Sequence, residues 1–205
     1  MTASPFTVPR FPRIARAAVA AWLGLALLAG ATGFLARLAF PGPQLIILAL
    51  LAATLAASTA VPALRAWIDA LPLRVLIGIN AVRFIGIPFL VLAARGQIGP
   101  VFAQRAGWGD IATATLALVL VAAGDPHTRT RRALAHAWNA FGALDLVVAV
   151  ATATWVTIRG LTPGIQPVLA LPLVFVPTFV VPILLASHVF IFRRLLALGR
   201  NRDGR

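Results

Sequence analysis

Residues 73–94 read LRVLIGINAVRFIGIPFLVLAA, which is typical of a helix that crosses a membrane. A helix of about 20 apolar residues, rising 1.5 Å per residue, crosses the roughly 30 Å hydrocarbon core of a membrane. Arg83 lies near the middle of the stretch. An arginine at that depth costs about 2.5 to 3.5 kcal/mol on insertion scales, so we expect it to face the interior of a helix bundle and to meet an anion or several carbonyl groups.

Five further apolar stretches extend this interpretation to the whole chain. The predicted helices are 16–40, 44–64, 73–94, 100–123, 133–158 and 171–195. Of the 205 residues, 60% are hydrophobic and 11% are charged, whereas soluble domains have about 25% charged residues. The sequence therefore predicts an all-α integral membrane protein, with residues 1–205 forming a single six-helix transmembrane bundle.

The basic residues test this map, because cytoplasmic ends of spans are enriched in positive charge. All 18 are arginines. With the N-terminus inside, thirteen fall in cytoplasmic segments: Arg10, Arg13, Arg16, Arg65, Arg74, Arg129, Arg131, Arg132, Arg193, Arg194, Arg200, Arg202 and Arg205. Four fall outside, namely Arg37, Arg95, Arg105 and Arg159, and Arg83 alone lies within a span. The count predicts that both termini are cytoplasmic.

The net charge of +13 does not indicate a nucleic-acid partner, because the arginines flank apolar spans. We expect the lipid bilayer as partner, with anionic head groups at the cytoplasmic arginines, and a protein partner or a homo-oligomer stays open. The first apolar run follows three arginines, as in a signal peptide, but it exceeds the usual 7 to 15 residues and favours an uncleaved span. The chain has no cysteine, so disulfides and thiolate chemistry are excluded.

Asp145 lies near the middle of the fifth predicted helix and is the expected partner of Arg83. Asn80 precedes Arg83 by three residues and shares its helix face. Asn139 precedes Asp145 by six residues, about 120° around the helix, so the two cannot point at one spot. Two interpretations stay open: a structural ion pair that fixes helix packing, or a polar site that binds a solute or a proton.

Asp110 ends the run Gly107-Trp108-Gly109-Asp110, after which the strictly apolar residues 111–123 are too short to cross a membrane. Either the helix begins near Pro100 and buries Asp110, or the preceding segment is re-entrant. Asp110 then either caps a short helix or lies at the outer mouth of the polar interior, with residues 96–110 as an outer lid.

The sixth predicted helix contains Pro172, Pro177 and Pro182, so we expect it to be bent or broken and suited to gating a site. His136 and His188 lie at similar depths, which makes them weak candidates for the axial ligands of a haem b. We predict no other cofactor and no metal. We predict no catalytic residue, because zinc-protease, serine-elbow and phosphate-loop motifs are absent.

Several segments of the chain resemble those of uncharacterised bacterial families of multi-pass membrane proteins. They are Arg83 to Leu90, Phe102-Ala103, Ala106 to Asp110, Asn139 to Leu146, and Val176 to Pro182 running on to His188. The resemblance covers roughly residues 80 to 194 and implies no activity. It groups five residues as a common set: Arg83, Asp110, Asn139, Asp145 and His188.

The leading hypothesis is a bacterial inner-membrane protein that binds or transports a small polar or anionic solute at these residues and Asn80. The alternative is an accessory or haem-binding membrane subunit of a larger complex, in which the Arg83–Asp145 pair is purely structural. A third hypothesis is a membrane enzyme acting on lipid, for which Asp110, Asp125 and His127 lie near the membrane surfaces.

Overall fold

The computed structural model describes residues 10–126 and 128–203, and within them the chain is helical without a β-strand. Six helical segments are long and apolar enough to cross a membrane, as the sequence predicts. They are Arg13–Ala31, Gly42–Ala60, Leu73–Ala94, Pro100–Ala122, Arg129–Ile158 and Val176–Gly199. His127 and Arg205 lie outside the described residues.

The first two predicted helices are each divided by a helix-breaking residue. The first, α1 (Arg13–Ala31), ends before Gly33, whose φ of 65° is the left-handed conformation that favours glycine, and a short α2 (Phe34–Arg37) follows. The second, α3 (Gly42–Ala60), ends where Pro62 begins α4 (Pro62–Ala70). Proline removes a backbone donor but fits a first helical turn, so it ends one helix and starts the next.

The third span is one continuous helix of two kinds of winding. It consists of α5 (Leu73–Gly78), the 3₁₀ segment η1 (Ile79–Ile85) and α6 (Gly86–Ala94). In a 3₁₀ helix residues three apart are eclipsed. Asn80 and Arg83 therefore lie on one face, as expected, and both are completely buried.

The fourth and fifth spans are the straight helices α7 (Pro100–Ala122) and α8 (Arg129–Ile158). Pro100 occupies the first turn of α7 after Gly99, and residues 100–110 are part of this helix. The re-entrant segment, the outer lid of residues 96–110 and the capping role of Asp110 are therefore wrong. Asp110 lies in the helix interior and is buried, which is the alternative in which the helix starts near Pro100.

The sixth span begins later than predicted and is irregular, as its prolines indicate. Residues 171–174 form turns, followed after Phe175 by a π segment η3 (Val176–Val180) and by α9 (Val181–Asp203). Pro172 thus precedes the helix, Pro177 lies in the π segment and Pro182 lies in the first turn of α9. The missing proline donors explain the local change of winding.

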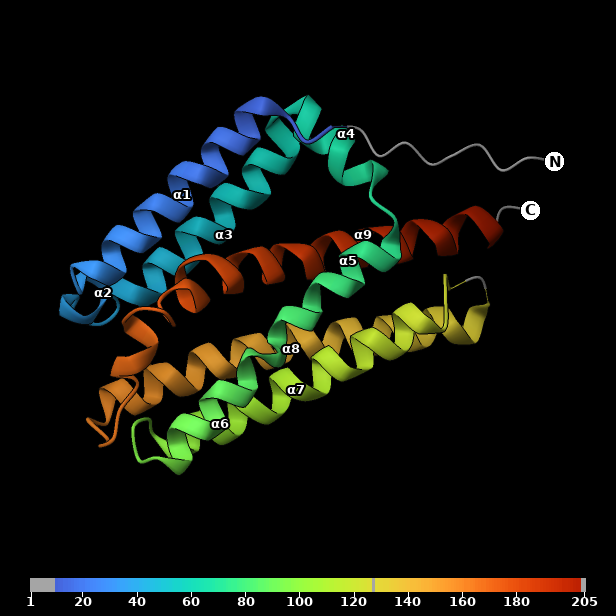
Figure 1. Ribbon diagram of the computed structural model, residues 1–205. Coiled ribbons are helices and arrows are strands. Elements are labelled where there is room, and N and C mark those ends of the chain that lie inside the picture. Colours follow the sequence, from blue (N-terminus) through green and yellow to red (C-terminus); the bar gives the residue numbers. More distant parts are fainter. Residues whose placement is uncertain (1–9, 127, 204–205) are drawn as a thin grey trace.

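The helices form a bundle in which α7 and α8 lie side by side and α9 packs on α8 and α3 (Figure 1). Helix α1 lies at the edge of the bundle with only Ala15 and Ala26 buried. It is held by Trp22, whose indole N–H donates to the Thr178 carbonyl at 2.6 Å and whose ring packs on Phe179. The apolar side chains left exposed on α1 are those expected to face lipid.

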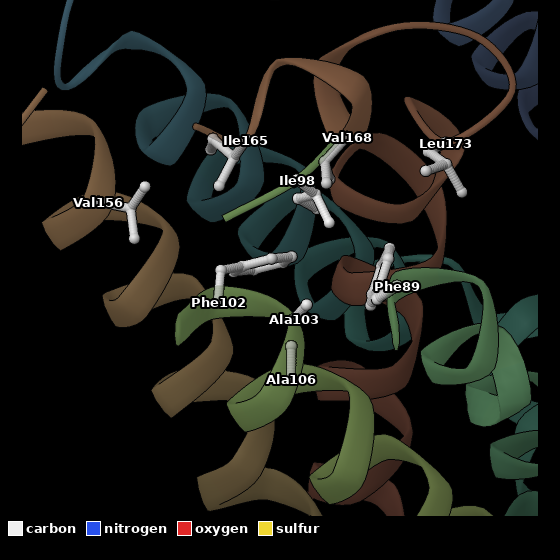
Figure 2. Packing of buried hydrophobic residues seen from close by; sticks show 9 residues of the cluster. All are labelled: Phe89, Ile98, Phe102, Ala103, Ala106, Val156, Ile165, Val168 and Leu173. Atoms are coloured by element: carbon white, nitrogen blue, oxygen red, sulfur yellow. The ribbon is translucent and has the colours of Figure 1, made fainter. Parts of the chain in front are cut away.

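Two apolar clusters close the two ends of the bundle. The first joins α6, α7, α8 and the 3₁₀ segment η2 (Gln166–Leu169), with Phe89 and Phe102 5.5 Å apart at its centre (Figure 2). The second joins α5, α7, α8 and α9 around Trp138 and Ile191 at the arginine-rich end. The polar side chains of the third and fifth spans lie between these two clusters.

Candidate functional site

Arg83 is the centre of a buried charged network that connects three helical segments. Its Nε donates to Asp110 Oδ1 at 2.7 Å, its Nη1 donates to the Gly142 carbonyl at 2.8 Å, and its Nη2 donates to Asp145 Oδ2. The side chains of Arg83, Asp110 and Asp145 are 1%, 8% and 9% exposed. The pairing of Arg83 with Asp145 is therefore present, and Asp110 is a second partner.

Glycines at the helix crossings bring these charges together. A Cβ on Gly86 would overlap the Gly107 carbonyl oxygen and lie 2.9 Å from the Asp110 Cβ, so only glycine permits this close approach of the third span to α7. A Cβ on Gly109 would overlap the carboxylate of Asp145. Small residues at crossings allow backbones to approach in membrane bundles, and here they set the distances within the network.

Asn139 and His188 form a second buried pair between α8 and α9. The Asn139 amide nitrogen donates to the His188 carbonyl at 3.0 Å, and Asn139 Oδ1 lies 2.7 Å from His188 Nδ1. Because an amide oxygen only accepts, Nδ1 of His188 carries the proton and Nε2 presents a lone pair. The ring lies against Gly142, where a Cβ would be 2.7 Å from Cε1. Gly142 therefore connects the pair to Arg83, which binds its carbonyl.

Asn80 is not bonded to either group. Its amide nitrogen lies 3.3 Å from the carbonyls of Leu76 and Ile77 in its own helix. The structure thus assembles Arg83, Asp110 and Asp145 into one group and Asn139 with His188 into another. Asn80 is buried beside Arg83 on the same helix face without a shared hydrogen bond among the described residues.

Three buried polar atoms have no hydrogen-bond partner within the described part of the chain: Gln44 Oε1, Asn80 Oδ1 and His188 Nε2. All three are acceptors. The orientation of the Asn80 side-chain amide follows from its neighbours: the carbonyls of Leu76 and Ile77 accept hydrogen bonds, so the amide nitrogen of Asn80 must face them. The interior therefore has unused capacity to accept hydrogen bonds, which a donor group, a water molecule or a cation satisfies.

The net charge of the network also favours a hydrogen-bond donor or a cation. One guanidinium faces two carboxylates, so the group carries a net charge of −1 when all three are ionised. An uncompensated charge in a low-dielectric interior is costly. An added anion would increase the imbalance, whereas a proton or another cation would remove it.

A cavity of about 80 Å³ reaches this network. Its wall comes from α3, η1, α6, α7, α8, η2, η3 and α9, and it is apolar apart from the three polar residues Gln44, Arg83 and Asp110. Gln44 donates to Thr154 Oγ1 at 2.9 Å and leaves its oxygen without a partner among the described residues. The space is large enough for several water molecules or a solute of a few non-hydrogen atoms. The π segment of the sixth span, with Val176 and Pro177, forms one side.

The histidines do not fit a haem. The free nitrogen of His188, Nε2, is buried 3.1 Å from the position of a Cβ on Gly142, which leaves no space for a macrocycle. His136 lies half-buried with its ring 6.0 Å from that of Phe192. Within the described residues, no three His, Asp or Glu side chains are grouped to hold a metal ion.

Asp110 was grouped with Arg83 from the sequence, but the bond between them was not predicted. The role of Gly109 and Gly142 in positioning charges and the place of Gln44 in the cavity wall were also not predicted. The glycine spacing around Asp110 was the available signal, because Gly107 and Gly109 mark two faces of close approach.

Fold and site together define an all-helical protein of the multi-pass membrane type with a buried Arg–Asp–Asp network. The chain belongs to the family of the domain of unknown function DUF8737, which matches residues 40–196. The match begins after α1 and α2 and contains every residue of the network and of the cavity. No curated protein and no solved structure matches this chain.

Proposed function

We propose that this protein binds, and moves across the membrane, a small and largely apolar solute that carries one hydrogen-bond donor or positive charge. The cavity beside Arg83 and Asp110 carries the proposal, because it combines an apolar wall with a charged group at one side and Gln44 in its wall. The surplus carboxylate of the network and the unpartnered oxygen of Gln44 in the cavity wall favour a donor. Of the polar or anionic solute expected from the sequence, the polar one is therefore kept and the anionic one is replaced by a cationic one.

The irregular sixth span supports movement rather than storage alone. Val176, Pro177 and Val180 of the π segment line the cavity. Interrupted helices at membrane depth are common at transporter binding sites because their backbone groups and packing can change. A change of winding in η3 would alter this wall directly.

Filling the cavity tests the proposal without touching the charges. Ala149 and Ala153 of α8 line the cavity, whereas Ala151 on the same helix is exposed. The variants Ala149→Leu and Ala153→Leu should lose a compound that wild-type protein retains through mild detergent purification, detected by native mass spectrometry and by extraction. Ala151→Leu is the matched control and should retain it. The proposal is contradicted if the wild-type protein retains no compound, or if the filled variants retain the same compounds as the wild type.

A second candidate is an accessory membrane subunit or homo-oligomer in which the network is a structural clasp. It is favoured by the complete burial of Arg83 and by its bonds to two other helices. In that case the filled variants would behave as the control does.

We also infer that the protein is a bacterial inner-membrane protein whose arginine-rich end faces the cytoplasm. The support is the distribution of arginines between the two ends of the spans and the resemblance to bacterial membrane families. Because the six spans alternate in direction, α1 begins and α9 ends on that same side (Figure 1).

A further inference from the structure

A second cavity lies at the arginine-rich end, away from the charged network. Helix α4 runs from the end of α3 toward the start of α5 and lies over α9 (Figure 1). The cavity between them has a volume of about 320 Å³, and its polar residues are Ser58, Arg65, Asp69, Arg193 and Arg194. Apolar side chains of α4 and α9 complete the wall.

The charge of this cavity is positive. Three guanidinium groups face one carboxylate, which gives a net charge of +2. Arg65 and Asp69 are 3.9 Å apart with side chains 62% and 65% exposed, and such an exposed pair is weak. Arg65 and Arg193 are exposed and free to turn toward an anion.

Arg194 is held in place by the backbone of α4. Its Nη1 donates to the Leu71 carbonyl and its Nη2 to the Ile68 carbonyl, which lie at the C-terminal end of that helix. A guanidinium has five N–H donors, so three remain after these two bonds. The side chain is therefore already oriented, and an anion that binds it loses less entropy in doing so.

The position and sequence of α4 favour a cavity at the level of lipid head groups. Its sequence, PALRAWIDA, puts Arg65 and Asp69 on an exposed face, while the ring of Trp67 packs 4.6 Å from the ring of Phe11, which precedes α1. Tryptophan is enriched where a membrane meets water. We expect a short helix with this pattern to lie along the interface, so that the cavity beneath it opens among the head groups.

We infer that the cavity formed by α3, α4 and α9 binds a phosphate group, carried by the head group of an anionic membrane lipid. Guanidinium groups match the tetrahedral oxygens of a phosphate through paired N–H donors. The held Arg194 supplies a fixed pair, and Arg65 and Arg193 supply the additional charge. Ser58 is buried beside them, and its hydroxyl donates to the Leu55 carbonyl at 2.7 Å. The Ser58 oxygen can therefore only accept a further hydrogen bond.

The test compares two variants that lose the same charge at the same end of the protein. Arg65→Gln/Arg193→Gln removes two arginines of the cavity, and Arg74→Gln/Arg129→Gln removes two exposed arginines outside it. Native mass spectrometry measures binding of phosphatidylglycerol, with phosphatidylcholine as reference. We expect roughly 25-fold weaker phosphatidylglycerol binding for the first variant, because two charged contacts to the bound phosphate are lost. We expect little change for the second variant, because its arginines lie outside the cavity.

Inorganic phosphate distinguishes the two sources of the group. If phosphate alone binds wild-type protein in a manner that depends on Arg65 and Arg193 while phosphatidylglycerol does not, the cavity takes free phosphate and the lipid assignment is wrong. Equal losses of phosphatidylglycerol in both double variants overturn the site altogether, because general surface charge then explains binding. Both variants should keep the thermal unfolding of wild type, since all four side chains are exposed.

Discussion

The imbalance of one guanidinium and two carboxylates predicts that two substitutions in the same network differ sharply. Arg83→Met removes all three hydrogen bonds of the guanidinium and leaves Asp110 and Asp145 without their cation. Breaking a buried ion pair by removing one partner costs about 3 to 5 kcal/mol. We expect the free energy of unfolding to fall by about 4 kcal/mol.

Asp145→Asn should behave in the opposite way. The amide oxygen still accepts from Nη2 of Arg83, and the charges become balanced at one guanidinium to one carboxylate. The loss of a charge-assisted bond, about 1 kcal/mol, is offset by the removal of the uncompensated charge. We therefore expect the unfolding free energy of Asp145→Asn to stay within about 1 kcal/mol of wild type, while the proposed binding of a donor solute is lost.

The measurement is unfolding of purified protein in lipid bicelles, followed by the fluorescence of its five tryptophans. The triple variant Arg83→Met/Asp110→Asn/Asp145→Asn is the control, because it removes every charge and should recover most of the loss caused by Arg83→Met. If Asp145→Asn destabilises the protein as much as Arg83→Met, the charge count is wrong and both carboxylates are needed for folding.

Two further predictions concern a close crossing and the topology. Gly109→Ala should cost about 1 to 3 kcal/mol and displace Asp145, whereas Gly24→Ala, where a Cβ has nothing within 4 Å, should be neutral or slightly stabilising in the same unfolding assay. Since the chain has no cysteine, a single cysteine introduced at an exposed position reports on which side of the membrane that position lies. A membrane-impermeant maleimide added to spheroplasts should label Gln97→Cys but not Thr130→Cys. The reverse pattern would refute cytoplasmic termini.

The number of spans was predictable because it follows from the length of each apolar stretch. The contact of Arg83 with Asp145 was predictable because two opposite charges at equal depth have few other partners. The 120° separation of Asn139 from Asp145 was also correct, since Asn139 binds His188 and Asp145 binds Arg83. Each of these follows from helix geometry and from the cost of unpaired charge.

The second carboxylate was harder to predict. Hydropathy alone does not decide whether α7 starts at Pro100 or after Asp110, because Gly107 and Gly109 weaken the apolar signal. The position of Asp110 depends on tertiary packing, because the close approach of Gly86 to Gly107 brings Asp110 within hydrogen-bonding distance of Arg83. A single sequence does not show which helices cross at which glycines, so neither the charge of the network nor the cavity beside it could be derived.

The 3₁₀ segment η1 has a consequence for the whole third span. A 3₁₀ helix advances about 120° and 2.0 Å per residue, against about 100° and 1.5 Å in an α-helix. Over the seven residues Ile79–Ile85 the difference accumulates to a rotation of about 140° and a lengthening of about 3.5 Å. The two halves of the span therefore present different faces, with α5 packing on α7 and α9 and α6 packing on α7. Arg83 lies within η1. A change of η1 from a 3₁₀ helix to an α-helix would therefore rotate the guanidinium of Arg83 around the helix axis and separate it from both carboxylates.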